Sequence, residues 1–344
     1  MACAPFFHNH QKLLSMKRKL LTLLALALSA NVFSAIDPNT VEVNFDCNTA
    51  TVTMAENIKA YVAVASGTSS HVKLLQAESF AGVDATADNE DGEIIYVLSG
   101  TSSDGEFYLE GAFKCSVELN GLTLTNPSGP AINLQNGKRC SVTAKKGTTS
   151  TLVDGVNEDF NGCYHCKGHT KFKGKGILNV SGNSRHAIYS KEYLEIKNLT
   201  LNITSSVKDA IHCKEYFLME SGTVTINSAG DDGIQVELAN DPVTGIIADH
   251  EDENTGNFYM EGGTLTINNY ADKAVKADGE LKITGGKRVF NENDMLAHAG
   301  IADQWADAAA ASFYDLNGRR ISQPQLRGIY IERRGDKTIK RIVR

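Results

Sequence analysis

The chain has 344 residues, enough for one large domain or two small ones, and its 42% hydrophobic and 22% charged residues exclude a disordered chain and a polytopic membrane protein. Its 30 glycines favour short strands and tight turns over long helices. Residues 36–311 hold 21 basic and 38 acidic side chains, so this part is expected to repel nucleic acid and to attract cations.

The first 35 residues have the pattern of an export signal. Basic residues at 17–19 precede an apolar run, Leu20–Ala30, and small residues suited to cleavage follow it as far as Ala35. The run is too short to span a bilayer. We therefore predict a leader over residues 1–35 and a mature protein that is secreted or held at the cell surface, with no membrane span. A buried N-terminal helix is the alternative.

Six cysteines follow the leader, an even number for an oxidising compartment: Cys47, Cys115, Cys140, Cys163, Cys166 and Cys213. Cys115-Ser-Val and Cys140-Ser-Val recur after 25 residues, which should bring these two thiols together. A disulfide and a pair of reduced thiols both fit this spacing. The spacing Cys163-x2-Cys166-x2-His169 is only half of a zinc site, because a second pair of ligands is missing.

A short phrase of alternating apolar residues recurs through the chain. It occurs at Ile177–Val180, Leu201–Ile203, Val224–Ile226 and Leu265–Ile267. Seven residues after each phrase comes a small residue: Ala187, Ala210, Gly233 and Ala274. These small residues are 23, 23 and 41 residues apart, so the last step contains an insertion. Alternation with period 2 indicates strands, and a repeat of this length without a helical part indicates stacked coils.

The stacked coils predict an all-β fold, a right-handed parallel β-helix over residues 36–290. Each coil of such a solenoid adds one strand to each of three parallel sheets, with strands about 4.8 Å apart. Residues 291–311 are expected to form a linker or cap, and residues 312–344 a small β tail. A leucine-rich repeat is disfavoured because the period has no helical half. A β-sandwich remains the alternative, because alternating strands alone also fit it.

The last 33 residues carry a pattern of their own. It consists of Phe313–Arg320, then Gly328–Ile331, and a basic final stretch from Lys337 to Arg344. This pattern resembles the C-terminal sorting tails of type IX secretion substrates of Bacteroidetes. The resemblance implies export to the cell surface, whereas a small hairpin cap is the alternative.

Acidic residues occupy the turn before several of the small residues. Asp209 and Asp232 stand at equivalent positions, as do Asp231 and Asp272 one residue earlier. Stacked carboxylates repel one another, and a bound cation removes that penalty. Because Ca²⁺ takes oxygen ligands in irregular loops, we predict a calcium site at these four residues. The alternative is that they cap turns through backbone N–H groups.

The insertion offers further oxygen ligands: Glu237, Asp241, Asp249, Glu251, Asp252 and Glu253. Aromatic residues are frequent on the same coils: Tyr164, Tyr189, Tyr193, Tyr216 and Phe217. Aromatic rings pack well on sugar faces, although packing between coils explains them equally well. We predict that Tyr189, His212, Lys214 and Lys273 contact carbohydrate. No nucleophile elbow or phosphate loop is present, and paired aspartates for glycoside hydrolysis remain open.

Three phrases, Gly222–Asn227, Gly230–Ile234 and Gly262–Ile267, resemble the secreted carbohydrate-binding domain-containing β-helix family. The resemblance implies calcium at the acidic turns and binding of plant cell-wall polysaccharide. The chain is also similar to family 9 pectate lyases, in which calcium neutralises the uronate and a lysine abstracts the proton. Two turns depart from the family phrase, Arg185-His186 and Asp272-Lys273-Ala274.

We therefore expect a monomeric, calcium-dependent protein that binds cell-wall or acidic polysaccharide. The alternative is a polysaccharide lyase with Lys208, Lys214 or Lys273 as base, which needs a lysine of lowered pKa. Neighbouring carboxylates raise a lysine's pKa, and this favours binding over catalysis. A third alternative is an adhesin or surface structural protein without a sugar site.

Overall fold

The computed structural model describes residues 36–66, 70–78, 80, 93–239, 253–298, 312–316, 319–321, 328–334 and 337–343. The predicted leader lies outside these ranges, as do Asp241, Asp249, Glu251 and Asp252 of the insertion. Within these ranges the fold is all-β, with only two three-residue 3-10 helices, Glu56–Ile58 and Glu292–Asp294. None of the helices found there is long and apolar enough to cross a membrane.

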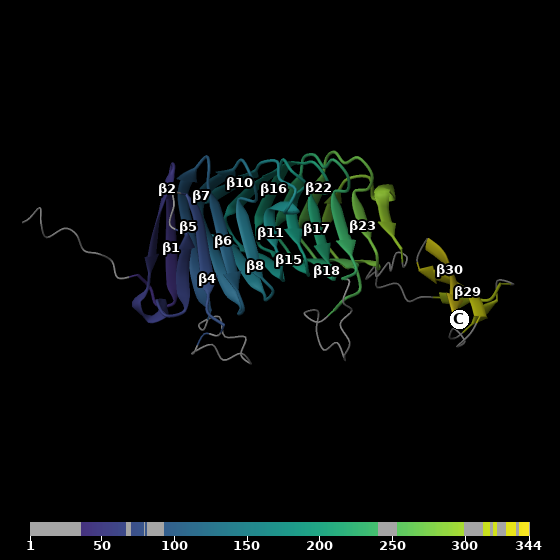
Figure 1. The fold of residues 1–344 in the computed structure, drawn as a ribbon. Coiled ribbons are helices and arrows are strands. Elements are labelled where there is room, and N and C mark those ends of the chain that lie inside the picture. Colours follow the sequence, from purple (N-terminus) through teal and green to yellow (C-terminus); the bar gives the residue numbers. More distant parts are fainter. Residues whose placement is uncertain are drawn as a thin grey trace, which may run out of the picture.

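Two long sheets, built mostly of parallel strands, run along the molecule (Figure 1). In the described residues, the first has ten strands: β3 (Val62–Ser66), β4 (His71–Gln76), β6 (Glu106–Gly111), β8 (Ile132–Asn136), β11 (Gly162–Cys166), β14 (His186–Ser190), β17 (Ile211–Lys214), β20 (Ile234–Glu237), β23 (Val275–Ala277) and β26 (Met295–Ala297). We call this the ten-stranded sheet.

The second sheet contains two parallel rows of strands. One row is β9 (Cys140–Ala144), β12 (Thr170–Gly174), β15 (Leu194–Lys197), β18 (Tyr216–Met219), β21 (Asn257–Met260) and β24 (Leu281–Ile283). The other is β10 (Thr149–Asp154), β13 (Ile177–Gly182), β16 (Thr200–Ser206), β19 (Thr223–Ile226), β22 (Thr264–Ile267) and β25 (Lys287–Val289). From β11 onward, consecutive strands along the chain therefore belong in turn to the ten-stranded sheet and to these two rows.

The long strand β7 (Cys115–Asn126) joins the two rows into one sheet. Its first half pairs with β9 and its second half with β10. Of the three sheets expected from the sequence, two are therefore continuous at this end of the molecule. Beyond β7 the sheet continues through β5 (Ile94–Ser102) to β1 (Thr40–Asp46), which pairs antiparallel with β2 (Thr49–Met54).

The pairing register aligns the apolar positions of successive coils. Tyr164, Ile188, Ile211, Ile234 and Val275 are partners in turn, at steps of 24, 23, 23 and 41 residues. This is the alignment that the recurring phrases predict, and all five side chains are fully buried. Burial of a large aliphatic or aromatic side chain stabilises a fold by about 1.5–3 kcal/mol. Columns of such residues between the sheets therefore provide the core.

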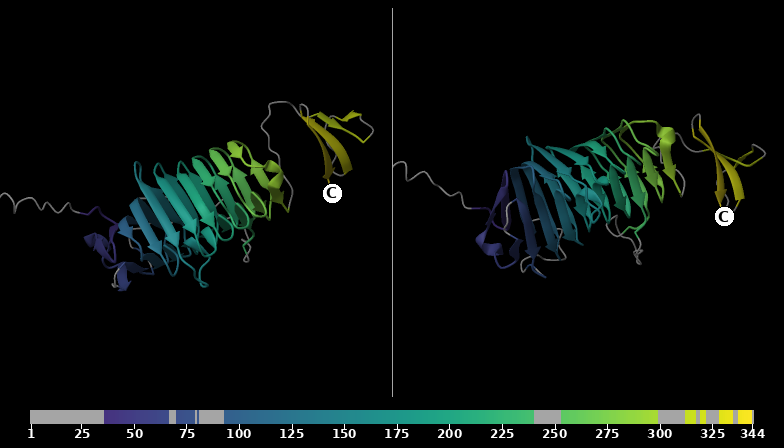
Figure 2. Two further views of the ribbon diagram at one scale, coloured as in Figure 1. Left: turned by 90° about the horizontal axis from the view of Figure 1, so that it is seen from above. Right: turned by 45° about the horizontal axis from the view of Figure 1, so that its top comes forward.

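The strands stack in one direction from β1 to β26, as two further views show (Figure 2). The pairing of β25 with β22 reaches the end that the sequence suggests at residue 290, and pairing continues past it, because β26 pairs with β23. Both strands have three residues, too few to show period-2 alternation. The tail forms a separate antiparallel sheet of β27 (Ser312–Tyr314), β28 (Arg320–Ile321), β29 (Gly328–Arg334) and β30 (Lys337–Val343).

The predicted proximity of two thiols is confirmed. Cys115 and Cys140 are register partners on β7 and β9, and their Sγ atoms lie 3.6 Å apart in the core. All six cysteines of the described residues are free thiols in the structure.

Glycine is required at both ends of the Gly230-Asp-Asp-Gly233 phrase. A Cβ atom at Gly230 would overlap the carbonyl oxygen of Val207 in the preceding coil, and one at Gly233 would meet that of Ala274 in the next. We expect Gly230→Ala to lower the free energy of unfolding by about 1–3 kcal/mol, measured by urea denaturation. Gly137→Ala is the control, because nothing lies within 4 Å of its added methyl group. Equal stability of the two variants would contradict the close approach.

Candidate functional site

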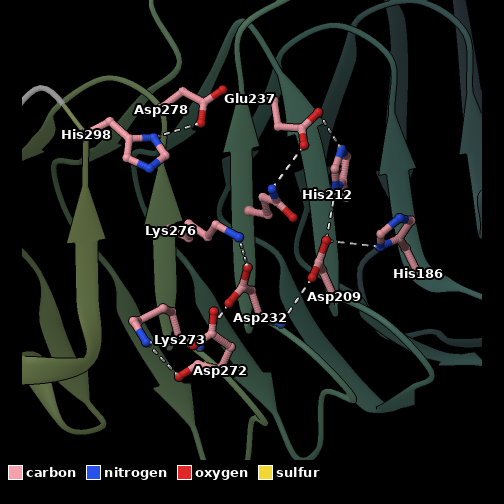
Figure 3. Close-up of polar contacts among 11 residues, drawn as sticks. His186, Asp209, His212, Asp232, Glu237, Asp272, Lys273, Lys276, Asp278 and His298 are labelled. Carbon is pink, nitrogen blue, oxygen red and sulfur yellow. Dashed lines mark hydrogen bonds and ion pairs between the residues drawn. The ribbon is translucent and has the colours of Figure 1, made fainter.

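The acidic turns lie at the start of two neighbouring strands of the ten-stranded sheet. Asp209 precedes β17 and Asp232 precedes β20, and Ile211 pairs with Ile234. The two aspartates therefore occupy equivalent positions in adjacent coils, as predicted (Figure 3). Both are almost completely buried.

Each of these carboxylates accepts a backbone hydrogen bond from the next coil. The Asp232 N–H donates to Asp209 Oδ1 over 3.0 Å, and the Lys273 N–H donates to Asp232 Oδ1 over 2.9 Å. This is the turn-capping role that the sequence left as the alternative to metal binding. It explains why buried aspartates recur at this position: each satisfies a backbone donor of the following coil.

The second oxygen of each carboxylate lies near one or two nitrogen atoms of basic side chains. Asp209 Oδ2 lies 2.9 Å from His212 Nδ1 and 3.3 Å from His186 Nδ1. Asp232 Oδ2 lies 3.3 Å from Lys276 Nζ. Burial raises the pKa of Asp232 despite the opposing effects of the Lys273 N–H and Lys276.

These surroundings shift the pKa values of the two histidines in opposite directions. Burial disfavours the charged form of His212, but its contacts with Asp209 and Glu237 prevail and raise its pKa. Burial and the neighbouring charge of His212 lower the pKa of His186 to about 3, so its imidazole is neutral at pH 7.

The structure brings three of the four predicted metal ligands together. One oxygen from each of Asp209, Asp231 and Asp232 lies within 4.8 Å of the other two, and Asp231 is exposed. Asp272 is not part of this group. Its Oδ1 lies 2.6 Å from Lys273 Nζ, and this contact lowers the pKa of Asp272. Glu237 of the insertion contacts Lys214 and His212 instead.

Three of the four predicted carbohydrate contacts lie side by side on β14 and β17. Tyr189 pairs with His212, and their rings stack with centroids 5.5 Å apart. Lys214 is on the same strand as His212, with its Nζ 3.3 Å from Glu237 Oε2. Lys273 lies apart from them, in the turn before β23, bound to Asp272.

Most of the remaining aromatic rings pack between coils. Tyr164, Tyr193, Tyr216 and Phe217 are at most 1% exposed, so sugar cannot reach their faces. Cys163 and Cys166 are likewise in the core, whereas His169 binds Glu192 and Glu215. Cys163, Cys166 and His169 therefore do not form a zinc site together, although His169, Glu192 and Glu215 have ligand atoms within 4.8 Å of one another.

Sequence reasoning missed two features of this surface. His186, the first residue of β14, stands in the column of Asp209 and Asp232, although the sequence shows it only as a departure from the family phrase. Lys167, Lys191 and Lys214 form a row, because the residues before them, Cys166, Ser190 and Cys213, are register partners. The same alignment that groups the aspartates would have found both features.

Comparison with known proteins identifies a matching family and a solved structure with a similar fold. The sequence model of a family described as "carbohydrate-binding domain-containing protein" matches residues 79–312. A solved structure of a polysaccharide lyase-like protein from C. thermocellum, a gadolinium derivative, is similar with a TM-score of 0.56 and 20% identity. The similarity covers 77% of this chain and 98% of the other, and at this identity it shows a common fold. No curated protein matches the chain.

Proposed function

The chain belongs to the carbohydrate-binding domain-containing family, and from this premise we propose that it binds acidic polysaccharide along the outer face of the ten-stranded sheet. The row of Lys167, Lys191 and Lys214 is the observation that carries the proposal. Neighbouring strands of a sheet lie about 4.8 Å apart, so the row presents evenly spaced charges to a polymer of acidic sugars. Lys167 and Lys191 are exposed and Lys214 is half-buried.

Tyr189 supplies an apolar contact beside this row. Its ring lies between those of His165 and His212, with centroids at 5.1 Å and 5.5 Å, and the side chain is half-buried. Because the two histidines cover the faces of the ring, a sugar would meet its edge and its hydroxyl group. A ring held in this way keeps its orientation and loses little entropy on binding. In this arrangement the lysines form ion pairs with the acidic groups of the polymer, and the tyrosine contacts a sugar ring.

The surroundings of the candidate bases support binding over a lyase reaction. A lysine base needs a pKa lowered towards neutrality. The pKa of Lys273 is raised, chiefly by its hydrogen bond to Asp272. Lys214 Nζ lies 3.3 Å from Glu237 Oε2, so this amine is already engaged in an ion pair. Both lysines are therefore suited to attracting acidic sugars rather than to removing a proton.

The proposed function includes a Ca²⁺ ion bound by Asp209, Asp231 and Asp232. Three carboxylates with oxygens within 4.8 Å of one another are a hard donor set of the kind that Ca²⁺ prefers. Exposed Asp231 would leave the ion open to solvent and to an acidic sugar. The ion would supply a positive charge that joins the acidic turn to the polymer.

We expect polygalacturonate in an affinity gel to retard the protein in the presence of Ca²⁺. Removing one exposed lysine, as in Lys191→Ala, should weaken binding about 2–5-fold, and removing the three-lysine row should weaken it much more. Added salt should weaken it further, because these charges are solvent-accessible. Lys287→Ala, an exposed lysine on β25 of the other sheet, is the matched control.

Three outcomes separate the proposals. Equal retardation of the triple lysine variant and the control would overturn binding at this face. Retardation unaffected by EGTA and by Asp231→Asn would overturn the calcium role. Ultraviolet absorbance from an unsaturated product on incubation with polygalacturonate would establish the lyase instead.

We further infer that the three parallel stacks close into a right-handed parallel β-helix. The support is the strand order, in which each coil visits each stack once, and the strong right-handed preference of parallel crossovers. Export through the predicted leader, with sorting by the C-terminal tail, would place the binding face outside the cell. Detection of the protein in culture medium or on intact cells tests this location.

A further inference from the structure

Three side chains from two adjacent coils converge on one point of the ten-stranded sheet. His186 begins β14, Asp209 lies in the turn before β17 and His212 is on β17 (Figure 3). Their exposed fractions are 7%, 2% and 8%. One ligand atom of each lies within 4.8 Å of the other two. We propose that these three residues bind a divalent transition-metal ion of the zinc class.

An unsatisfied atom points to the ligand independently of the cluster. His186 Nδ1 is buried and makes no hydrogen bond to any residue that the structure describes. It faces Asp209 Oδ2 at 3.3 Å, outside hydrogen-bond geometry. A buried polar atom without a partner costs free energy. A metal ion placed between His186 and Asp209 would remove that cost.

The distances suit a tetrahedral ion. Zinc binds nitrogen and oxygen at about 2.0–2.2 Å, which places neighbouring ligand atoms of a tetrahedron about 3.3–3.6 Å apart. The observed separations from Asp209 Oδ2 are 2.9 Å to His212 Nδ1 and 3.3 Å to His186 Nδ1. Small side-chain adjustments would therefore admit the ion. Two imidazole ligands select zinc over calcium, which takes oxygen ligands.

Neighbouring groups hold two of the ligands in orientation. Glu237 Oε2 lies 3.5 Å from His212 Nε2, on the side of the ring away from Asp209. Metal-binding histidines usually donate their second N–H to such a carboxylate. The Asp232 N–H holds Asp209 Oδ1 at 3.0 Å. Because His186 belongs to one coil and Asp209 and His212 to the next, the ion would link the two coils.

The test is a calorimetric titration of the metal-free full chain with Zn²⁺, first without Ca²⁺ and then in excess Ca²⁺, because Asp209 belongs to both proposed metal sites. We expect one Zn²⁺ per chain and a higher melting temperature on binding. Glu237→Gln should weaken Zn²⁺ binding about 10–100-fold, and His186→Ala should weaken it more. Two controls should change nothing: His298→Ala, which removes an exposed His–Asp pair, and Cys47→Ser, which removes the exposed thiol.

Co²⁺ substitution keeps the test decisive should His186→Ala fail to fold. Co²⁺ bound to the unmodified chain should give the visible absorption of a tetrahedral nitrogen–oxygen site and should be displaced by Zn²⁺. Its absence would overturn the proposal. So would stoichiometric Zn²⁺ binding that survives in folded His186→Ala, or that is lost in His298→Ala or Cys47→Ser.

Discussion

Asp209→Ala is expected to destabilise the protein by about 3–5 kcal/mol at pH 6, measured by urea denaturation in EDTA. The carboxylate is 2% exposed and contacts His212 Nδ1 at 2.9 Å. Its removal leaves the buried rings of His186 and His212 beside each other without the carboxylate oxygen that both Nδ1 atoms face. It also removes the acceptor of the Asp232 N–H, which the next coil cannot replace.

Two further variants separate the causes of this loss. Asp209→Asn keeps an oxygen for the Asp232 N–H but carries no charge, so its stability should lie between those of the wild type and Asp209→Ala. Asp231→Ala removes the adjacent, exposed carboxylate and should change stability by less than about 0.5 kcal/mol. If Asp209→Ala were as stable as Asp231→Ala, Asp209 would not hold adjacent coils together.

The alignment of coils could be predicted because it depends on a signal repeated along the chain. Each coil places an aliphatic or aromatic residue at the position of Ile188, Ile211 or Ile234, and a slip by one residue would turn every such side chain outward. The junction at β7 could not be predicted in this way. Its two halves pair with different rows although no sequence break separates them, and only the positions of β9 and β10 determine that pairing.

Side-chain direction limited what could be predicted of the site. Asp272 has the predicted register with Asp231, but its carboxylate contacts the adjacent Lys273 and is not among the grouped aspartates. His186 differs in chemistry from the aspartates of its column, so a search for repeated acidic residues passes over it. Residue spacing places His186 in register with Asp209, but it does not provide the 3.3 Å distance between His186 Nδ1 and Asp209 Oδ2.

A second expected effect concerns alkaline pH. His169 Nε2 lies 2.9 Å from Glu192 Oε2 and 3.4 Å from Glu215 Oε2, and the ring stacks on Tyr193 with centroids 4.2 Å apart. Burial alone would lower the pKa of His169, but the two carboxylates prevail and raise it to about 9. In the unfolded chain the pKa is about 6.5. The folded state therefore binds the proton more tightly than the unfolded state.

The sign of the effect follows from this difference. The stabilisation from charged His169 is complete below about pH 6.5 and is lost as the pH rises through about 9, with a total of about 3 kcal/mol. Urea denaturation at pH 6 and pH 9.5 should show this loss in the wild type, and His169→Gln should show correspondingly less. His71→Gln, whose partner Asp104 is largely exposed, should keep the wild-type pH dependence.

NMR titration of the His169 ring gives a direct measurement of the same quantity. A midpoint near the ordinary value of about 6.5 would contradict the strong pairing with Glu192 and Glu215. Glu215→Gln should lower the midpoint, because it removes one of the two charges that favour the imidazolium. If the midpoint stayed at about 9 in that variant, Glu192, the closer partner, would be the main source of the stabilisation.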